Sequence, residues 1–109
     1  MAPKTLSTTQ LRLIAQRFKA LAEPSRLEIL SVLKGGERTV TEILDRTGLG
    51  QANVSKHLQL LHAAGFVTRR KVGVSTWYRL ADADVFRLCD LMCGRVEKEA
   101  ATTGKLFTR

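Results

Sequence analysis

Apolar residues recur every three or four positions along most of the chain, which is the spacing of amphipathic helices. Capping boxes that begin at Ser7 and Thr39 mark two helix starts, and Pro24 suits the first turn of another helix. The pattern predicts four helices: 8–22, 24–34, one from after Thr39 to Gly48, and one over 51–64.

The periodicity changes after Gly65. Two β-rich segments on either side of Gly73 predict a hairpin with strands near 67–72 and 75–80. A last helix, capped by Asp82 or Asp84, is expected to run to about Ala101. The expected fold is mostly α with a β-hairpin: a winged helix-turn-helix in the order α-α-α-α-β-β-α. It forms a single domain, 1–109, with flexible ends at roughly 1–7 and 102–109.

Charge is distributed unevenly along the 109 residues. Residues 1–81 carry 13 Lys and Arg against 5 Asp and Glu, whereas residues 82–109 carry five of each sign. The net charge of +8 therefore lies in the first three-quarters of the chain. This asymmetry favours a polyanionic partner for the basic part and a protein partner for the neutral last helix.

The predicted helix over 51–64 has two unlike faces. Val54, Leu58 and Leu61 form one side, with His57 at its edge, where we expect it to pack or hydrogen-bond rather than bind a ligand. The opposite side is small and polar, and the helix contains no acidic residue. Such a face suits the major groove of DNA. The expected DNA-binding residues of this helix are Gln51, Ala52, Asn53, Ser55, Lys56 and Gln59.

Each of these side chains has a chemistry that suits DNA. The amides of Gln51, Asn53 and Gln59 can pair with adenine, and Lys56 can reach a guanine or a phosphate. Ser55 can donate to a base or a phosphate. The backbone amides of the first turn favour an anion, so a phosphate is expected there.

The hairpin adds further positive charge close to its turn. Arg70, Lys71 and Ser75 are expected to contact DNA, with the tip lying along the backbone or in the minor groove. Alternation sends Arg70 and its neighbours to opposite faces, so not all can meet the same phosphate. The alternative is that these charges only protect the edge of a sheet.

Two long segments resemble the ArsR/SmtB family of bacterial repressors. They are "FKALAEPSRLEILSVL" and "VTEILDRTGLGQANVSKHLQLLHAAGFVTRRKVGVSTWYRL", and the resemblance covers roughly 10–100. It implies a homodimer built on the first and last helices, which binds an inverted repeat and is released by an inducer. Gly50 departs from the family pattern, where serine often caps the recognition helix.

The resemblance also implies two metal sites, and neither is expected here. Thr39 and Thr41 stand where the first site has cysteines, and threonine hydroxyls are weak ligands for soft ions. The four positions of the second site are Asp82, Asp84, Arg95 and Lys98, and the two cations would repel a zinc ion.

The only cysteines, Cys89 and Cys93, lie four residues apart in the last helix. They extend an apolar stripe that includes Val85 and Met92, so both can simply fill a core. They can also sense a soft metal or metalloid ion, or become oxidised. The Cβ atoms of such a pair lie roughly 5–6 Å apart, too far for an unstrained disulfide. A site shared by two chains would supply four thiols.

The sequence favours a cytoplasmic DNA-binding repressor that senses an inducer. No apolar run is long enough to span a membrane, and the two cysteines make a poor disulfide framework, typical of a reducing compartment. An alternative function is a winged-helix protein-interaction module without direct DNA or inducer binding. A thiol oxidoreductase is not favoured, because the spacing is CxxxC and no βαβ pattern surrounds it. No enzymatic activity is expected.

Overall fold

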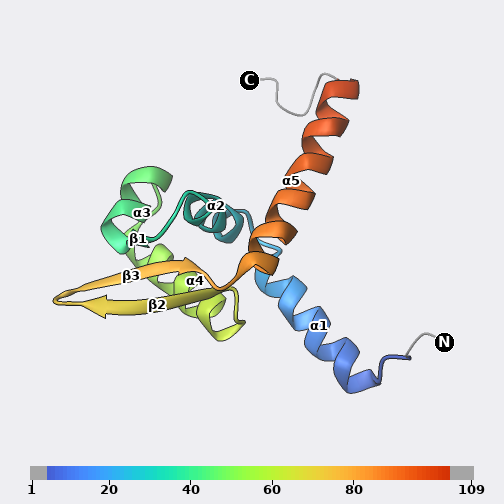
Figure 1. The fold of residues 1–109 in the computed structure, drawn as a ribbon, viewed down its shortest axis with the longest axis horizontal. Coiled ribbons are helices and arrows are strands. Elements are labelled where there is room, and N and C mark those ends of the chain that lie inside the picture. Colours follow the sequence, from blue (N-terminus) through green and yellow to red (C-terminus); the bar gives the residue numbers. More distant parts are fainter. Residues whose placement is uncertain (1–4, 104–109) are drawn as a thin grey trace.

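The computed structural model describes residues 5–103, and these form five helices and three strands (Figure 1). The strands build one small antiparallel sheet, and the long first and last helices extend away from it. In chain order the elements are α1 (Thr8–Leu21), α2 (Pro24–Leu33), β1 (Arg38–Thr39), α3 (Val40–Thr47), α4 (Gln51–Ala63), β2 (Val67–Val72), β3 (Ser75–Leu80) and α5 (Ala83–Thr103).

The helix ends follow the predicted capping chemistry. Both capping boxes are present. The side-chain oxygens of Ser7 and Thr39 each accept from the amide three residues ahead, and the backbone amides of these two residues donate in return to the side chains of Gln10 and Glu42. Gly48 ends α3 in the left-handed region, with φ of 70°. Asp82, rather than Asp84, caps α5, since its Oδ1 accepts from the amides of Asp84 and Val85. Local sequence therefore fixes where these helices begin and end.

The sheet has one strand more than expected. The hairpin strands lie where they were predicted, but β1 also pairs with β3, placing Arg38 opposite Tyr78 and Thr39 opposite Trp77. The strand order is β1-β3-β2, and the expected order α-α-α-α-β-β-α is corrected to α-α-β-α-α-β-β-α. A strand of two residues has no periodicity, so its pairing could not be predicted from sequence.

The core lies between α2, α3, α4 and the base of the hairpin. Ile29, Leu30, Ile43, Leu58 and Leu61 are fully buried, and Val67, Tyr78 and Val85 join the same cluster. This packing places α4 against β2 and thereby fixes α4 relative to the hairpin.

The chain ends are more regular than expected where the structure describes them. Ser7 is the cap of α1, and α5 continues to Thr103, beyond the predicted end at Ala101. The flexibility expected for 1–4 and 104–109 lies outside the described residues. Within residues 5–103, no helix is both long and apolar enough to cross a membrane.

Candidate nucleic-acid interface

Helix α4 has the two faces that the sequence predicts. Val54, Leu58 and Leu61 are fully buried, and this side holds the helix on the core. The polar side chains lie outward: Gln51, Ala52, Asn53, Lys56 and Gln59 are exposed, and Ser55 is half-buried. The structure thus brings the six predicted residues of this helix together on or beside one accessible face.

The first turn of α4 leaves its backbone amides without a side-chain cap. Gly50 is the N-cap residue and provides no oxygen for these amides. Uncapped amides at a helix start carry partial positive charge and can bind an anion. Because glycine replaces the serine typical of this position, the backbone amides of the first turn are free to bind a phosphate.

Two arginines tie α4 to the segment around α1 and α2. Arg26 Nε donates to His57 Nδ1 at 3.2 Å, and its Nη1 donates to the Ala20 carbonyl at 3.0 Å. His57 Nε2 lies 3.6 Å from Glu23 Oε2. Arg17 Nη1 donates to the Ala64 carbonyl, just past the end of α4. The expectation that His57 packs and hydrogen-bonds is confirmed, and sequence reasoning missed the arginine contacts.

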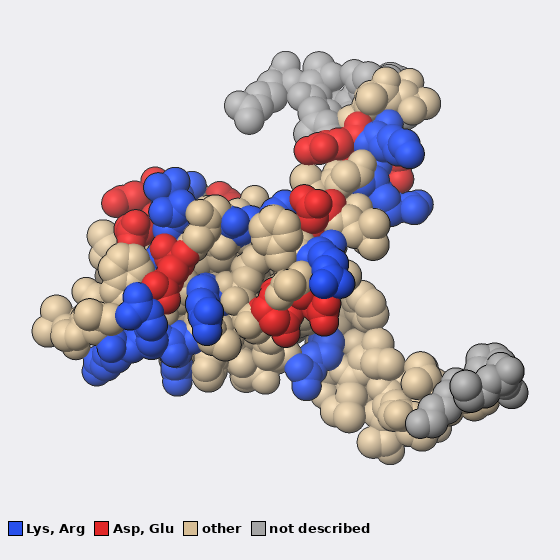
Figure 2. Space-filling view, viewed as in Figure 1, with Lys and Arg blue, Asp and Glu red and all other residues tan. Residues whose placement is uncertain are grey.

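Positive charge gathers on the hairpin. Figure 2 shows Lys and Arg along the hairpin, with Asp and Glu over α3 and near the start of α5. The hairpin closes with two residues, Gly73 and Val74, where Gly73 has φ of 61° and Val74 is fully exposed. Of the residues predicted to bind DNA, Lys71 is exposed and Ser75 is half-buried beside this turn.

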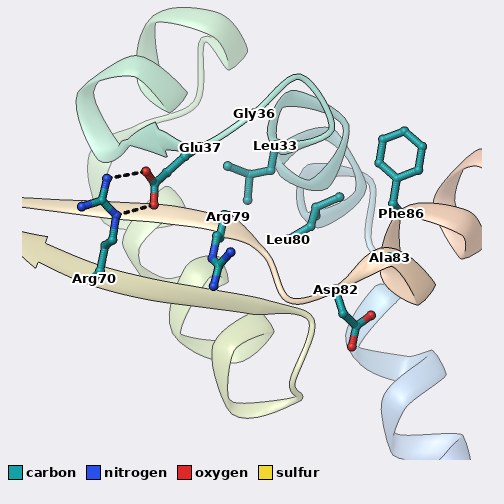
Figure 3. A pocket seen from close by; sticks show the side chains of 9 residues that line it. All are labelled: Leu33, Gly36, Glu37, Arg70, Arg79, Leu80, Asp82, Ala83 and Phe86. Carbon is teal, nitrogen blue, oxygen red and sulfur yellow. Dashed lines mark hydrogen bonds and ion pairs between the residues drawn. The ribbon is translucent and has the colours of Figure 1, made fainter.

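Arg70 is already engaged within the protein. Its guanidinium donates two hydrogen bonds to the carboxylate of Glu37, at 2.8 and 2.7 Å (Figure 3). These bonds lower the pKa of Glu37 below its ordinary value and raise the pKa of Arg70. The structure therefore shows Arg70 as half of an ion pair, whereas the sequence suggested a free cation.

A shallow groove lies where the hairpin base meets α5. Figure 3 shows its walls: Glu37, Arg70 and Arg79 on one side, and Leu33, Leu80 and Phe86 toward α2 and α5. Arg79 Nε donates to Thr68 Oγ1 at 3.1 Å. The groove carries charges of both signs, so it has no clear preference for a cation or an anion.

The two cysteines of α5 differ in exposure. Cys89 is half-buried against the core, and burial raises the pKa of its thiol. Cys93 is exposed, and its Sγ donates to Glu97 Oε1 at 3.5 Å, which raises the pKa of the Cys93 thiol. The nearby Arg87 pairs with Asp84, with 3.3 Å between Nη1 and Oδ1. Both thiols therefore favour the protonated form at neutral pH.

Metal ligands are sparse around these thiols. Among residues 5–103, no group of three or more His, Cys, Asp or Glu side chains is placed to hold a metal ion. The carboxylate of Asp90 is paired with Lys34, with 3.2 Å between Oδ1 and Nζ. Within the described residues, one chain thus provides two thiols as possible ligands for a metal ion, and no larger cluster of ligands.

Apolar surface remains open on α1 and α5. No residue of α1 is buried, and Leu11, Ile14 and Phe18 are 40–59% exposed. Met92 is 58% exposed on α5. A mainly apolar groove runs between the two helices, lined by Ile14, Phe18, Leu21, Phe66, Val85 and Leu88 among others. A patch of this kind is typical of a protein-protein interface.

Comparisons with known proteins identify the family. The sequence profile described as "Bacterial regulatory protein, arsR family" matches residues 23–69, from the N-cap of α2 into β2. The homodimeric winged helix-turn-helix DNA-binding domain Mb0332 from Mycobacterium bovis is 36% identical and superposes with a TM-score of 0.78. That match covers 90% of this chain and 92% of the M. bovis domain. The chain belongs to the ArsR family.

Curated relatives within the family are transcriptional regulators. The regulator Rv0324 of Mycobacterium tuberculosis is 42% identical over 72% of this chain, and the probable mercury resistance operon repressor of Streptomyces lividans is 38% identical over 72%. The aligned parts span 35% and 60% of those two proteins. The expected winged helix-turn-helix fold is confirmed by these comparisons.

Proposed function

We propose that this ArsR-family chain is a homodimeric transcriptional repressor that binds an inverted-repeat operator and is released from it by an inducer. The observation that carries the proposal is the accessible polar face of α4, which is held on the core by Val54, Leu58 and Leu61. A helix fixed in this way can enter the major groove without losing its packing.

The face of α4 supports a division of roles. Gln51, Asn53 and Gln59 supply amides for adenine, and Lys56 supplies a cation for guanine or phosphate. The uncapped first turn, with Ala52 allowing close approach, receives a backbone phosphate. Ser55 is half-buried and is suited to one hydrogen bond at the margin. Lys71 places the hairpin beside the flanking DNA, and Ser75 lies next to the two-residue turn at its tip.

The exposed apolar faces of α1 and α5 support the dimer. Phe18 and Met92 lose contact with water when a second copy covers these helices. The M. bovis domain, which has the same fold, is homodimeric. Two copies related by a twofold axis present two α4 helices, which accounts for an inverted-repeat site.

The cysteine pair supports a soft metal or metalloid ion as the inducer. The thiolate is the form that attacks an oxidant, and the raised pKa values of both thiols disfavour that form. A soft ion instead displaces the thiol protons when it binds. Two chains in a dimer supply four thiols, and the S. lividans relative is named for mercury resistance.

The DNA-binding role is tested with duplex DNA from upstream of the chain's own coding region. Fluorescence anisotropy across a salt series should show at least tenfold weaker binding between low and moderate salt. Lys56→Gln should weaken binding, whereas Thr41→Ala, an exposed change on α3, should not. Affinity that barely responds to salt would refute the DNA-binding role.

The sensing role is tested by release from the same duplex. Arsenite, cadmium and zinc are added in turn to the wild type and to Cys89→Ser, with a persulfide donor as the oxidative comparison. We expect a soft ion to release the wild type and the serine variant to respond weakly. A wild type that stays bound with all four additions would leave the cysteines with a packing role only.

A further inference from the structure

The strand register divides the hairpin into two faces. Side chains alternate along β2, and each lies on the same side of the sheet as its partner on β3. Arg69 is opposite Tyr78, and Lys71 is opposite Thr76. Tyr78 is buried in the core with Leu58 and Leu61 of α4. Arg69 and Lys71 therefore lie on the inner face, the one that continues from α4.

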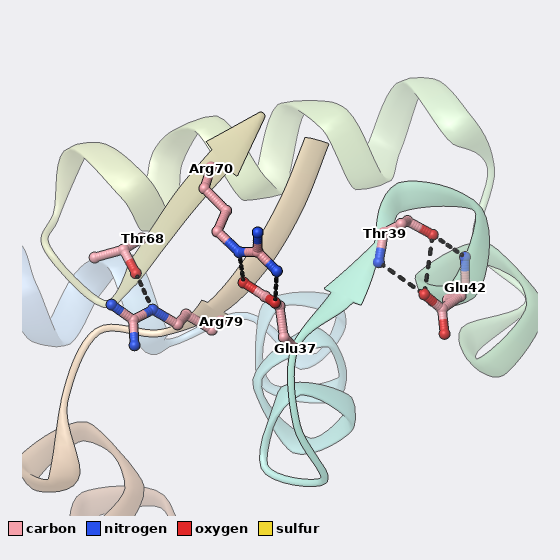
Figure 4. Close-up of polar contacts among 6 residues, drawn as sticks. All are labelled: Glu37, Thr39, Glu42, Thr68, Arg70 and Arg79. Atoms are coloured by element: carbon pink, nitrogen blue, oxygen red, sulfur yellow. Dashed lines mark hydrogen bonds and ion pairs between the residues drawn. The ribbon is translucent and has the colours of Figure 1, made fainter. Parts of the chain in front are cut away.

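Arg70 lies on the outer face. It is opposite Trp77, and its side chain reaches across the central strand β3 to Glu37, just before β1 (Figure 4). Thr68 and Arg79 are also opposite each other, and their hydrogen bond lies on this same face. The Arg70–Glu37 pair thus joins the two edges of the sheet.

The two kinds of cation also differ in their partners. Arg70 has a carboxylate with two short hydrogen bonds, the strong bidentate arrangement of arginine. Arg69 and Lys71 are exposed, and within residues 5–103 neither has a carboxylate at ion-pair distance. Among the described residues their charge has no competing partner, whereas the guanidinium of Arg70, itself 59% exposed, is paired with a carboxylate.

Moving Arg70 to a DNA phosphate would be unfavourable. It would break both bonds to Glu37 and leave that carboxylate without its hydrogen-bond partner beside a chain of negative phosphates. A duplex held at α4 also approaches the hairpin from the inner side. Arg69 and Lys71 can contact a phosphate without breaking an ion pair, and they lie on the side that the duplex approaches.

We propose that Glu37 divides the hairpin's cations by function. It holds Arg70 on the outer face as a brace across the sheet, and Arg69 and Lys71 on the inner face take the DNA phosphates. This inference rests on the proposed DNA-binding function. It adds Arg69 to the binding surface and makes Arg70 a positioning residue.

The test compares Arg69→Gln, Lys71→Gln and Arg70→Gln, three variants of adjacent residues that each remove one positive charge. Glu37→Gln is included as the other half of the brace. Affinity for the upstream duplex is measured by anisotropy over a salt series, and the slope of log K against log salt is compared. Circular dichroism melting checks that each variant folds.

We expect Arg69→Gln and Lys71→Gln each to reduce the salt slope by about 1, because each removes a phosphate contact. Arg70→Gln and Glu37→Gln should leave the slope unchanged. A reduced slope for Arg70→Gln, an increased slope for Glu37→Gln, or an unchanged slope for Arg69→Gln would overturn the proposal. All of these outcomes presuppose a steep wild-type slope, whose absence would instead count against DNA binding itself.

Discussion

Whether a charged side chain of this protein is free or paired depends on residues distant in the sequence. Arg70 and Lys71 are adjacent and look equivalent in the sequence, yet only Arg70 meets a carboxylate, 33 residues away. Sequence reasoning named both as DNA contacts, because no local pattern reveals Glu37. The alternation of β2 predicted that the two face opposite ways, but choosing the face required the burial of Tyr78.

The Arg70–Glu37 ion pair gives a prediction at the residue scale. The pKa of Glu37 is lowered by Arg70, so the contribution of the pair to stability is present above the pKa of the unfolded chain and is lost as pH falls through the lowered value. NMR titration of the Glu37 carboxyl carbon should give a midpoint below the ordinary value of 4.5. Arg70→Gln should move that midpoint upward, and an unchanged midpoint would contradict the pairing.

The cap of α3 gives a second residue-scale prediction. Thr39 Oγ1 accepts from the amide of Glu42, and Glu42 Oε1 accepts from the amide of Thr39. Thr39→Ala removes this cap and should lower the free energy of unfolding by about 1 kcal/mol in urea denaturation. Thr41→Ala is the matched control in the same turn. The side chain of Thr41 takes part in neither of these bonds, so its loss should change stability much less.

At the scale of elements, strong local signals were sufficient for most of the fold. Periodicity and capping residues predicted all five helices, and alternation around Gly73 predicted both hairpin strands at the observed positions. Two features escaped prediction because long-range contacts decide them: the pairing of β1 with β3, and the arginine bonds that hold α4. The polar face of α4 could be predicted because its buried side has regular helical spacing.

The exposed helices α1 and α5 give a prediction at this scale. Phe18→Asp and Met92→Asp place a charge where a second copy should bury apolar surface, so each should shift the protein from dimer to monomer in analytical ultracentrifugation. Val74→Asp is the matched control, since Val74 is fully exposed at the hairpin tip. Dimers of unchanged stability in both helix variants would exclude this interface.

At the scale of the whole molecule, the proposed functions occupy separate regions. The hairpin points away from α1 and α5, which project on the other side of the body (Figure 1). Between them, the hydrogen bonds of Arg17 and Arg26 link α1 and the α1–α2 junction directly to α4.

The hydrogen bonds of Arg26 give a prediction for the whole molecule. Arg26→Met removes the bonds to His57 and to the Ala20 carbonyl, and it should lower the free energy of unfolding by about 1–3 kcal/mol. It should also weaken binding to the upstream duplex, because α4 loses a fixed orientation. Denaturation and anisotropy on the same preparation measure both effects, and full affinity in a destabilised variant would show that the bonds serve folding alone.

The most direct test of the central claim is an NMR titration of the isotope-labelled protein with the upstream duplex. The backbone amides of Gln51–Gln59 and of Arg69–Ser75 should shift together as DNA is added, while those in the exposed part of α5 beyond Cys93 should change little. Shifts confined to α1 and α5, with α4 unaffected at saturating DNA, would contradict the account.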